Sequence, residues 1–317
     1  MHNLTIQKAE LHDVDEQADM LSGWQQEYRQ LGRGRFCGML SIADAGDFRL
    51  LRERTNQVLH ESVMPPADQL VVGMRLNCGN TENLLIDGRE FDQNAFMVID
   101  GRRAYDFRTR GALDLCGIAV KKDFLYARMH EQDALCMDTL LQRTTTTLAE
   151  PAANMLRQYF TAIGELLQGD GQNAQSEVSA RMIASSLISN LTLAVALGQH
   201  ARAEDALPRH KQRRDRIVQQ AIDYMRSNAD RDIDILDVCA AAGVSRRTLQ
   251  YCFEERLEIS PLQYLKALRL NRARRQLKRD QRHSVADIAS LCGFDHPSRF
   301  SSDYRRMFGE LPSQTRG

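Results

Sequence analysis

The sequence has few of the residues that build metal, redox and catalytic sites. Among 317 residues there are seven cysteines and eight histidines, with no C-x-x-C pair and no H-x-H pair. The odd, scattered cysteines argue against a zinc site or a disulfide framework. A P-loop and a G-x-S-x-G motif are also missing. The sequence therefore predicts no catalytic residue, no metal and no cofactor, and it does not predict an enzyme.

Long apolar runs are missing too. The longest, 182–197, is interrupted by serine, asparagine and threonine residues and is too short and too polar to span a bilayer. Residues 1–10 have no charged segment followed by an apolar run, so no signal peptide is predicted. We therefore expect a cytoplasmic protein with no membrane partner. The composition, 43% hydrophobic and 26% charged, is typical of a globular chain long enough for two domains.

The net charge of zero conceals an asymmetry along the chain. Residues 209–317 contain 22 basic and 14 acidic residues, a net charge of +8, whereas residues 1–208 have 20 basic and 28 acidic residues, a net charge of −8. A basic C-terminal part suggests a polyanionic partner, which by charge alone could be DNA, RNA or an anionic membrane.

The pattern of the first 200 residues predicts an α+β domain. Residues 36–120 are predicted to be β-rich, because alternating segments such as 112–120 are separated by hairpin-type turns at Asp87-Gly88 and Asp100-Gly101. They indicate an antiparallel sandwich or barrel of cupin-like type. Helices are expected over 123–199, including 151–168 and 176–199 with one apolar face each. These two could form a dimer interface or pack within the domain. The polar segment 201–214 is expected to be a linker.

An internal repeat dominates the C-terminal part, 215–317. Residues 237–261 and 287–312 share a glycine and, after a one-residue insertion in the second copy, three large apolar residues and a proline spaced four positions apart. In the first copy Asp234 and Ser245 can cap two helices, Gly243 permits a tight turn and Val244 fills the angle between the helices. This all-α part therefore predicts two helix-turn-helix units.

The second copy repeats this pattern with different residues. Ser284 and Asp287 form an expected capping box, Gly293 is the turn, Phe294 fills the angle and Asp295 can cap the next helix. Between the copies, Ser260 and Pro261 start a helix of about 18 residues, which would span ~27 Å.

Three stretches resemble one family of bacterial transcription regulators, AraC/XylS. They are GVSRRTLQ (243–250), SPLQYLKALRLNRARRQL (260–277) and VADIASLCGFDHPSRFSSDYRRMFGELP (285–312). The resemblance implies two recognition helices in successive major grooves of double-stranded DNA, an N-terminal domain that binds an effector or a second copy of the chain, and an activator that meets RNA polymerase. It also implies that Arg269 braces the two units through an ion pair. A homodimer is expected.

The resemblance and the exposed helix faces together predict the DNA-binding residues. An Arg side chain can pair with guanine and a Gln side chain with adenine, whereas short or proline side chains offer less direct readout. The second unit, with Pro297 and several serines, is therefore expected to act mostly on phosphates. The predicted contacts are Ser245, Arg246, Arg247, Gln250, Tyr251, His296, Ser298, Arg299, Ser301 and Ser302.

A second resemblance covers residues 24–38, WQQEYRQLGRGRFCG. It is similar to a stretch of the activators of ethanolamine utilisation and related amine catabolism. The similarity implies a catabolic operon and a small-molecule effector, ethanolamine or another amine. Trp24, Tyr28 and Phe36 are the candidate effector-binding residues, although a core role is at least as common for such side chains.

Two other functions are consistent with parts of the sequence. A cupin-like enzyme would use the β-rich domain, but His60 is the only histidine within residues 36–120. A non-specific nucleic-acid-binding protein would explain the positive charge, but it would not need paired reading helices. The sequence therefore favours a sequence-specific regulator.

Overall fold

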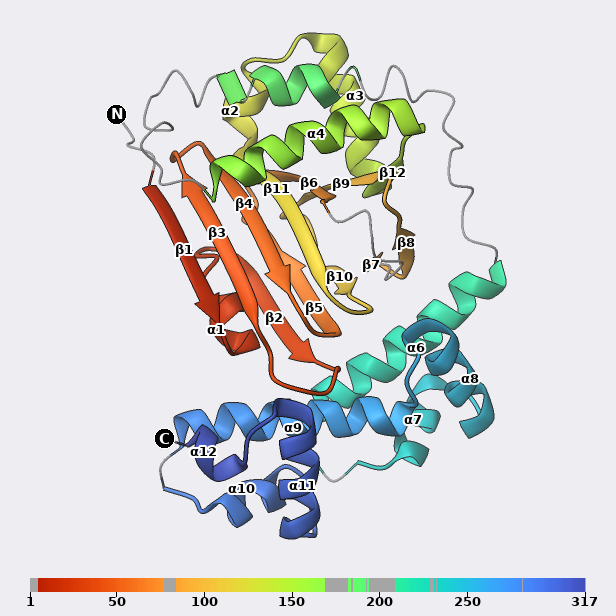
Figure 1. Cartoon of the computed structure of the whole chain (residues 1–317). Coiled ribbons are helices and arrows are strands. Elements are labelled where there is room, and N and C mark those ends of the chain that lie inside the picture. Colours follow the sequence, from red (N-terminus) through yellow and green to blue (C-terminus); the bar gives the residue numbers. More distant parts are fainter. Residues whose placement is uncertain are drawn as a thin grey trace. The chain divides into compact units, whose positions relative to one another are not determined.

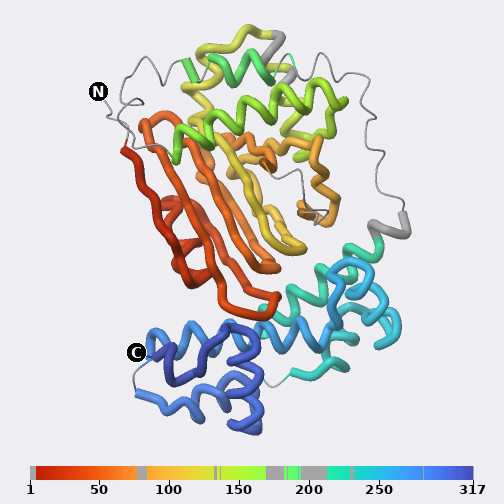
Figure 2. The backbone as a smooth tube through the Cα atoms, in the orientation of Figure 1, coloured from red at the N-terminus to blue at the C-terminus, as the bar shows by residue number. Residues whose placement is uncertain are grey.

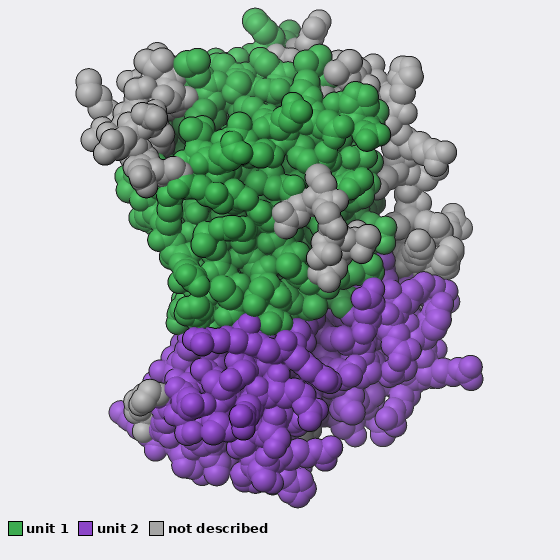
Figure 3. Space-filling view, viewed as in Figure 1, with its two compact units in different colours: residues 1–28, 36–204 green, residues 29–35, 205–317 purple. Residues whose placement is uncertain are grey.

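The chain divides into two compact units. The computed structural model describes residues 5–76, 84–168, 182–183, 185–191, 193, 209–228, 231, 233–280 and 282–316. The N-terminal unit comprises residues 1–28 and 36–204, and the C-terminal unit comprises residues 29–35 and 205–317 (Figure 3). Each unit has its own hydrophobic cores.

Antiparallel strands dominate the first part of the chain (Figure 1). The strands are β1 (Thr5–Leu11), β2 (Gln25–Gln30), β3 (Gly38–Asp44), β4 (Phe48–Thr55), β5 (Leu59–Met64), β6 (Gln69–Arg75), β7 (Leu84–Ile86), β8 (Arg89–Phe91), β9 (Ala95–Asp100), β10 (Tyr105–Arg108), β11 (Leu113–Lys121) and β12 (Thr145–Thr147). In the described ranges they form a seven-stranded sheet, β1-β3-β4-β11-β6-β9-β12, and a five-stranded sheet, β2-β5-β10-β7-β8.

The central strands of the larger sheet are buried on both faces. In β6, Leu70 and Val72 point into the core beneath the helices, whereas Val71 between them points into the core shared by the two sheets. Strand β11 alternates in the same way, with Ile118 on the helix side and Ala119 on the sheet side. Because successive strand side chains point to opposite faces, this alternation produces a sandwich with a helical cover. The predicted β-rich domain is confirmed.

Helices α1 (Val14–Asp19), α2 (Lys122–Tyr126), α3 (Glu131–Arg143) and α4 (Glu150–Leu166) complete the N-terminal unit. Helix α4 lies along one face of the larger sheet and buries Leu156, Phe160 and Ile163 (Figure 2). The expected helix 176–199 lies only partly within the described residues, of which 182–183, 185–191 and 193 are helical. The apolar faces of α4 and of residues 185–191 both pack into the core of this unit. This packing favours an intradomain role for the two segments over a dimer interface.

Two boundaries differ from the sequence prediction. Strand pairing begins at Thr5 rather than at residue 36, because β1 and β2 are largely polar (TIQKAEL and QQEYRQ) and their alternation is weak. Of the predicted linker 201–214, residues 201–208 lie outside the described residues and 209–214 belong to α6.

The C-terminal unit is helical and has two cores. Its helices are α6 (Arg209–Ser227), α7 (Ile235–Ala242), α8 (Arg246–Leu257), α9 (Pro261–Arg279), α10 (Val285–Leu291), α11 (Pro297–Phe308) and α12 (Pro312–Thr315). Helix α9 contributes to both cores: Tyr264, Leu265 and Leu268 pack with α6–α8, and Ala273 and Leu277 pack with α10 and α11. In the part of the chain that the structure describes, no helix is long and apolar enough to cross a membrane.

Candidate functional site

The first helix-turn-helix unit consists of α7 and α8, and its caps match the prediction. The Asp234 carboxylate accepts hydrogen bonds from the backbone N–H groups of Leu236 (2.7 Å) and Asp237 (3.0 Å), and Asp237 reciprocates by accepting from the N–H of Asp234 (2.8 Å). Ser245 caps α8 by accepting from the Thr248 N–H at 3.2 Å. These bonds satisfy amide donors that would otherwise have no helical partner, so they fix where each helix begins.

Gly243 forms the turn between α7 and α8 in the left-handed region, with φ 63° and ψ 33°. The next residue, Val244, is half-buried and packs against the core of this unit. Glycine adopts a positive φ without steric cost, so the angle between the two helices depends on this position.

The turn makes a testable prediction about stability. Gly243→Val should lower the free energy of unfolding of the C-terminal unit by about 1–3 kcal/mol, because a β-branched side chain resists a positive φ. A Cβ at this position would meet no described heavy atom within 4 Å, so the backbone alone sets the cost. Gly243→Asn is the control, since Asn tolerates this region and should lose much less. Hydrogen exchange of the α7 and α8 amides measures the difference, and a valine variant as protected as the wild type would contradict the placement of the turn.

Helix α8 has a buried face and an exposed face. Leu249 and Phe253 are fully buried in the core. Of the predicted DNA-binding residues, Ser245, Arg246, Arg247 and Tyr251 are exposed and Gln250 is half-buried. The side chains of Ser245, Arg246, Arg247 and Tyr251, which are predicted to contact DNA, therefore lie exposed near the start of α8.

Two contacts orient the exposed face of α8. The Gln250 side chain donates to Glu254 Oε1 at 2.5 Å. The Arg214 guanidinium of α6 lies 4.9 Å from the ring centroid of Tyr251, a cation–π distance. Pairing of Gln250 with adenine would require the side chain to give up its hydrogen bond to Glu254. Among the described residues, the Arg247 guanidinium has no such bond to exchange.

The second unit, α10 and α11, begins as predicted but differs at the second cap. The Asp287 N–H donates to Ser284 Oγ at 3.1 Å and the Ser284 N–H donates to Asp287 Oδ2 at 2.9 Å, which forms the expected capping box. The N-cap of α11 is His296, without a side-chain capping bond, and not Asp295. Pro297 explains the shift, because proline suits the first helical position and keeps the preceding residue extended.

The exposed face of α11 contains most of the predicted contacts. His296, Ser298, Arg299 and Ser302 are exposed. Ser301 is half-buried, and its hydroxyl donates to the Pro297 carbonyl at 3.0 Å.

Sequence reasoning did not single out Arg305 and Arg306, which are both exposed further along α11. Their spacing from Ser298 and Ser302 places them on the same side of the helix, a signal that the sequence contained. They increase the positive charge beside the predicted DNA contacts of α11.

Arg269 of α9 connects the two helix-turn-helix units. Its guanidinium donates to the Ile233 carbonyl before α7 at 2.9 Å and to the Gly293 carbonyl in the second turn at 3.3 Å. These two hydrogen bonds join the units through backbone carbonyls, and the expected ion pair of Arg269 stays a prediction. A Cβ on Gly293, whose φ is 78°, would lie 2.8 Å from Arg269 Cζ, so glycine makes room for the brace. The α9 helix of 19 residues is about 28 Å long at 1.5 Å per residue.

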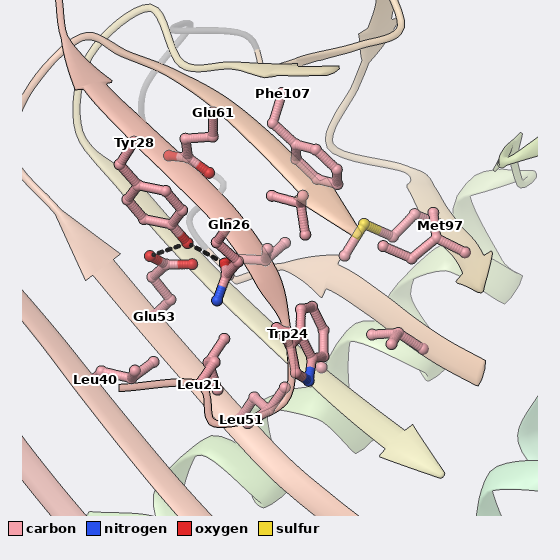
Figure 4. A pocket seen from close by; sticks show the side chains of 15 residues that line it. Leu21, Trp24, Gln26, Tyr28, Leu40, Leu51, Glu53, Glu61, Met97 and Phe107 are labelled. Atoms are coloured by element: carbon pink, nitrogen blue, oxygen red, sulfur yellow. Dashed lines mark hydrogen bonds between the residues drawn. The ribbon is translucent and has the colours of Figure 1, made fainter. Parts of the chain in front are cut away.

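A cavity lies between the two sheets of the N-terminal unit. It has a volume of about 50 Å³. Its apolar lining includes Leu21, Leu40, Leu51, Val63, Met97 and Phe107. Trp24 and Tyr28, two of the three candidate effector residues, line it (Figure 4). Phe36, the third, is buried in the core beside the cavity but does not belong to its lining.

Two carboxylates in the cavity wall were not foreseen. The Tyr28 hydroxyl lies 3.1 Å from Glu53 Oε1 and 3.0 Å from Gln26 Oε1 (Figure 4). The Gln17 side chain donates to the same Glu53 oxygen at 2.5 Å. Burial raises the pKa of Glu53, against these hydrogen bonds, which lower it. Glu53 is therefore a partly buried carboxylate with hydrogen-bond donors.

Glu61 has a different environment. Its side chain is 2% exposed, and among the described residues no hydrogen-bond donor reaches its Oε1. Burial raises its pKa well above the usual value, and the negative charges of Glu53 and Asp106 raise it further. The sequence did contain a signal for both acids, since Glu53 follows Leu51 and Glu61 separates Leu59 from Val63 at alternate, inward-facing strand positions.

One group of side chains could be considered for a metal. In the described part of the chain, Glu10, His12 and Cys37 bring ligand atoms within 4.8 Å of one another, and all three are exposed. Side chains that hold a metal are usually fixed in turn by hydrogen bonds to other protein groups. Exposed acidic groups also lie close together in many proteins that bind no ion there. We assign no metal to them.

The family match lies in the C-terminal unit. Residues 238–317 match the model of the family described as Helix-turn-helix domain. By this match, residues 238–317 form a helix-turn-helix domain. The match begins within α7 and includes α8 and α11, the second helix of each helix-turn-helix unit. Curated proteins that the chain resembles over this region include transcriptional regulators.

Two curated relatives and one solved structure show the extent of the similarity. The chain is 37% identical over 100 residues to the "Probable thc operon regulatory protein" of Rhodococcus erythropolis, covering 31% of this chain and 30% of that protein. It is 37% identical over 99 residues to the HTH-type transcriptional regulator GbdR of Pseudomonas aeruginosa, covering 31% and 27%. A transcriptional regulator structure from Chromobacterium violaceum is 35% identical, with a TM-score of 0.30, covering 32% of this chain and 88% of that one. The chain thus matches less than a third of the length of these two curated relatives.

Proposed function

We propose that the chain is a sequence-specific DNA-binding regulator that activates a catabolic operon in response to a small-molecule effector. One observation carries the DNA-binding part. Two helix-turn-helix units, joined by α9 and by the Arg269 brace, each expose a polar and basic face on the second helix. A helix with such a face fits the major groove, and two units on one scaffold can contact two successive grooves.

The effector that we propose is a small amine, ethanolamine or another. The support is the cavity of the N-terminal unit, in which Glu53 and Glu61 face an otherwise apolar and aromatic lining. Carboxylates in an apolar cavity favour a cationic ligand, because the ligand supplies the positive charge that the wall lacks.

Two further partners belong to this proposal. An activator contacts RNA polymerase, and we expect a homodimer, because two copies increase the effective concentration of the reading helices on DNA. The apolar faces of α4 and of 185–191 are used inside the N-terminal unit, so the dimer would form through another surface.

A variant of the first reading helix tests the function. Arg247→Ala should weaken binding to the preferred operator by about 1–3 kcal/mol and weaken binding to random DNA much less, because a bidentate contact to guanine discriminates between bases. Gel-shift titration of the full-length protein on both duplexes at one salt concentration measures the two losses.

Arg226→Ala is the control for net charge, since Arg226 lies in the last turn of α6, outside α8 and α11. It should reduce binding to both duplexes by a similar, small amount through its charge. Equal losses on the operator and on random DNA for Arg247→Ala would mean that Arg247 only holds phosphate.

A further inference from the structure

The wall of the N-terminal cavity contains two buried polar atoms that lack hydrogen-bond partners among the described residues: Glu61 Oε1 and Trp24 Nε1. One is an acceptor and the other is a donor. A buried polar atom without a partner costs free energy, so native proteins rarely leave two of them beside one cavity without a ligand or water. Figure 4 shows the Glu61 carboxylate and the indole nitrogen of Trp24 at different ends of the lining.

We propose that the cavity recognises a small amine at two points, with its ammonium group on Glu61 and a hydrogen-bond acceptor of the same molecule on Trp24. This inference rests on the proposed ligand-responsive function and specifies the chemistry of that site. The rest of the ligand is expected to be an apolar skeleton, because the lining is otherwise mainly apolar and includes Leu51, Val63 and Met97. The ligand class is therefore an amine that also contains one ether, hydroxyl or carbonyl oxygen.

Glu61 rather than Glu53 holds the ammonium group because of their different partners. Glu53 already accepts hydrogen bonds from Gln17 and Tyr28. Glu61 is buried and its Oε1 has no donor among the described residues. An incoming ammonium group gives Glu61 a charge-assisted hydrogen bond that the protein itself does not supply.

Binding should also release a proton. Burial raises the pKa of Glu61, with the charges of Glu53 and Asp106 adding to the effect. Tyr28 also faces this group, and His60 on β5 pairs with Asp106. The empty site therefore favours the protonated Glu61 carboxyl. The amine enters as a cation, Glu61 passes its proton to the solvent, and an ion pair forms, so affinity should rise with pH until the amine itself loses its proton.

Three probes of equal size separate the two contacts. 3-Methoxypropylamine contains the ammonium and the ether oxygen, pentylamine contains only the ammonium, and 3-methoxypropan-1-ol replaces the ammonium by a hydroxyl. Isothermal titration of the full-length protein at neutral pH gives each affinity. We expect 3-methoxypropylamine to bind about ten- to a hundredfold tighter than the alcohol, and about three- to tenfold tighter than pentylamine, the ratios for charged and neutral hydrogen bonds.

Three variants assign the contacts. Glu61→Gln should abolish the preference for the amine over the alcohol while it keeps the preference for the ether over the alkyl chain. Trp24→Phe should do the reverse. Glu131→Gln, at an exposed position of α3, is the control and should change neither ratio. Titrations of the wild type in two buffers of different ionisation enthalpy should report release of about one proton, and Glu61→Gln should not.

The outcomes are distinct. Equal affinity of the wild type for all three probes, or an amine preference that survives in folded Glu61→Gln, overturns the two-point site. A wild-type protein that fails to discriminate the probes but binds one operator selectively leaves the DNA-binding proposal intact. A protein that discriminates the probes but binds all duplexes alike keeps the cavity assignment and contradicts the proposed function.

Discussion

Phe300→Ala is expected to lower the free energy of unfolding of the C-terminal unit by about 3–5 kcal/mol, the range for removing a large aromatic side chain from a core. Phe300 is fully buried on α11. Its ring centroid lies 5.0 Å from that of Phe294 and 5.6 Å from that of Tyr304. Alanine would leave a cavity between these two rings and loosen the angle of the second helix-turn-helix unit.

The measurement is urea unfolding with hydrogen exchange of the α10 and α11 amides. Ser302→Ala, on the exposed face of the same helix, is the control and should change stability by no more than about 0.5 kcal/mol. An alanine variant at Phe300 that is as stable as the Ser302 control would show that α11 does not pack as described.

Arg274→Met is expected to cost about 3 kcal/mol, because it removes one partner of a largely buried ion pair. The Arg274 side chain is 10% exposed. Its guanidinium donates to Glu310 Oε1 at 2.6 Å and to Tyr304 Oη at 3.3 Å, and it lies over the Phe308 ring. The contact ties α9 to the segment after α11.

Acid should reduce the difference between wild type and Arg274→Met. Although burial opposes it, hydrogen bonds from Thr315 and Arg274 lower the pKa of Glu310. Because the pKa of Glu310 is lower in the folded state, the ionised carboxylate stabilises the fold at pH values above the ordinary pKa of glutamate. This stabilisation is lost as the pH falls through the lowered pKa. Unfolding should be measured at neutral pH and at about pH 3, with Arg274→Lys as the control that keeps the charge. A difference that is independent of pH would mean that Arg274 acts through packing alone.

The helix-turn-helix units could be predicted because their signals are local. Asp234, Ser245 and Ser284 are caps, Gly243 and Gly293 are turns, and each depends on residues within a few positions in the sequence. The cap of α11 was missed because the proline after His296 outweighs the capping preference of Asp295. Local patterns therefore determine most of the C-terminal unit.

The cavity depended on contacts that are distant in sequence. Glu53 and Glu61 lie on β4 and β5, which belong to different sheets, and only the packing of those sheets brings them near Tyr28. Phe36 was predicted from a resemblance to line the site but is buried beside it. A sequence pattern shows which side chains point inward, whereas the sheet arrangement decides which of them share a cavity.

The central claim is that two reading helices on one chain recognise one DNA site. Selection of duplexes from a random library by the full-length protein, followed by footprinting of the enriched site, tests it most directly. We predict one enriched sequence with two protected patches about one helical turn apart, ~34 Å. Arg247→Ala should change the preferred bases in one patch and leave the other unchanged. A library that stays random after selection, or a single patch unaffected by Arg247→Ala, would contradict the claim.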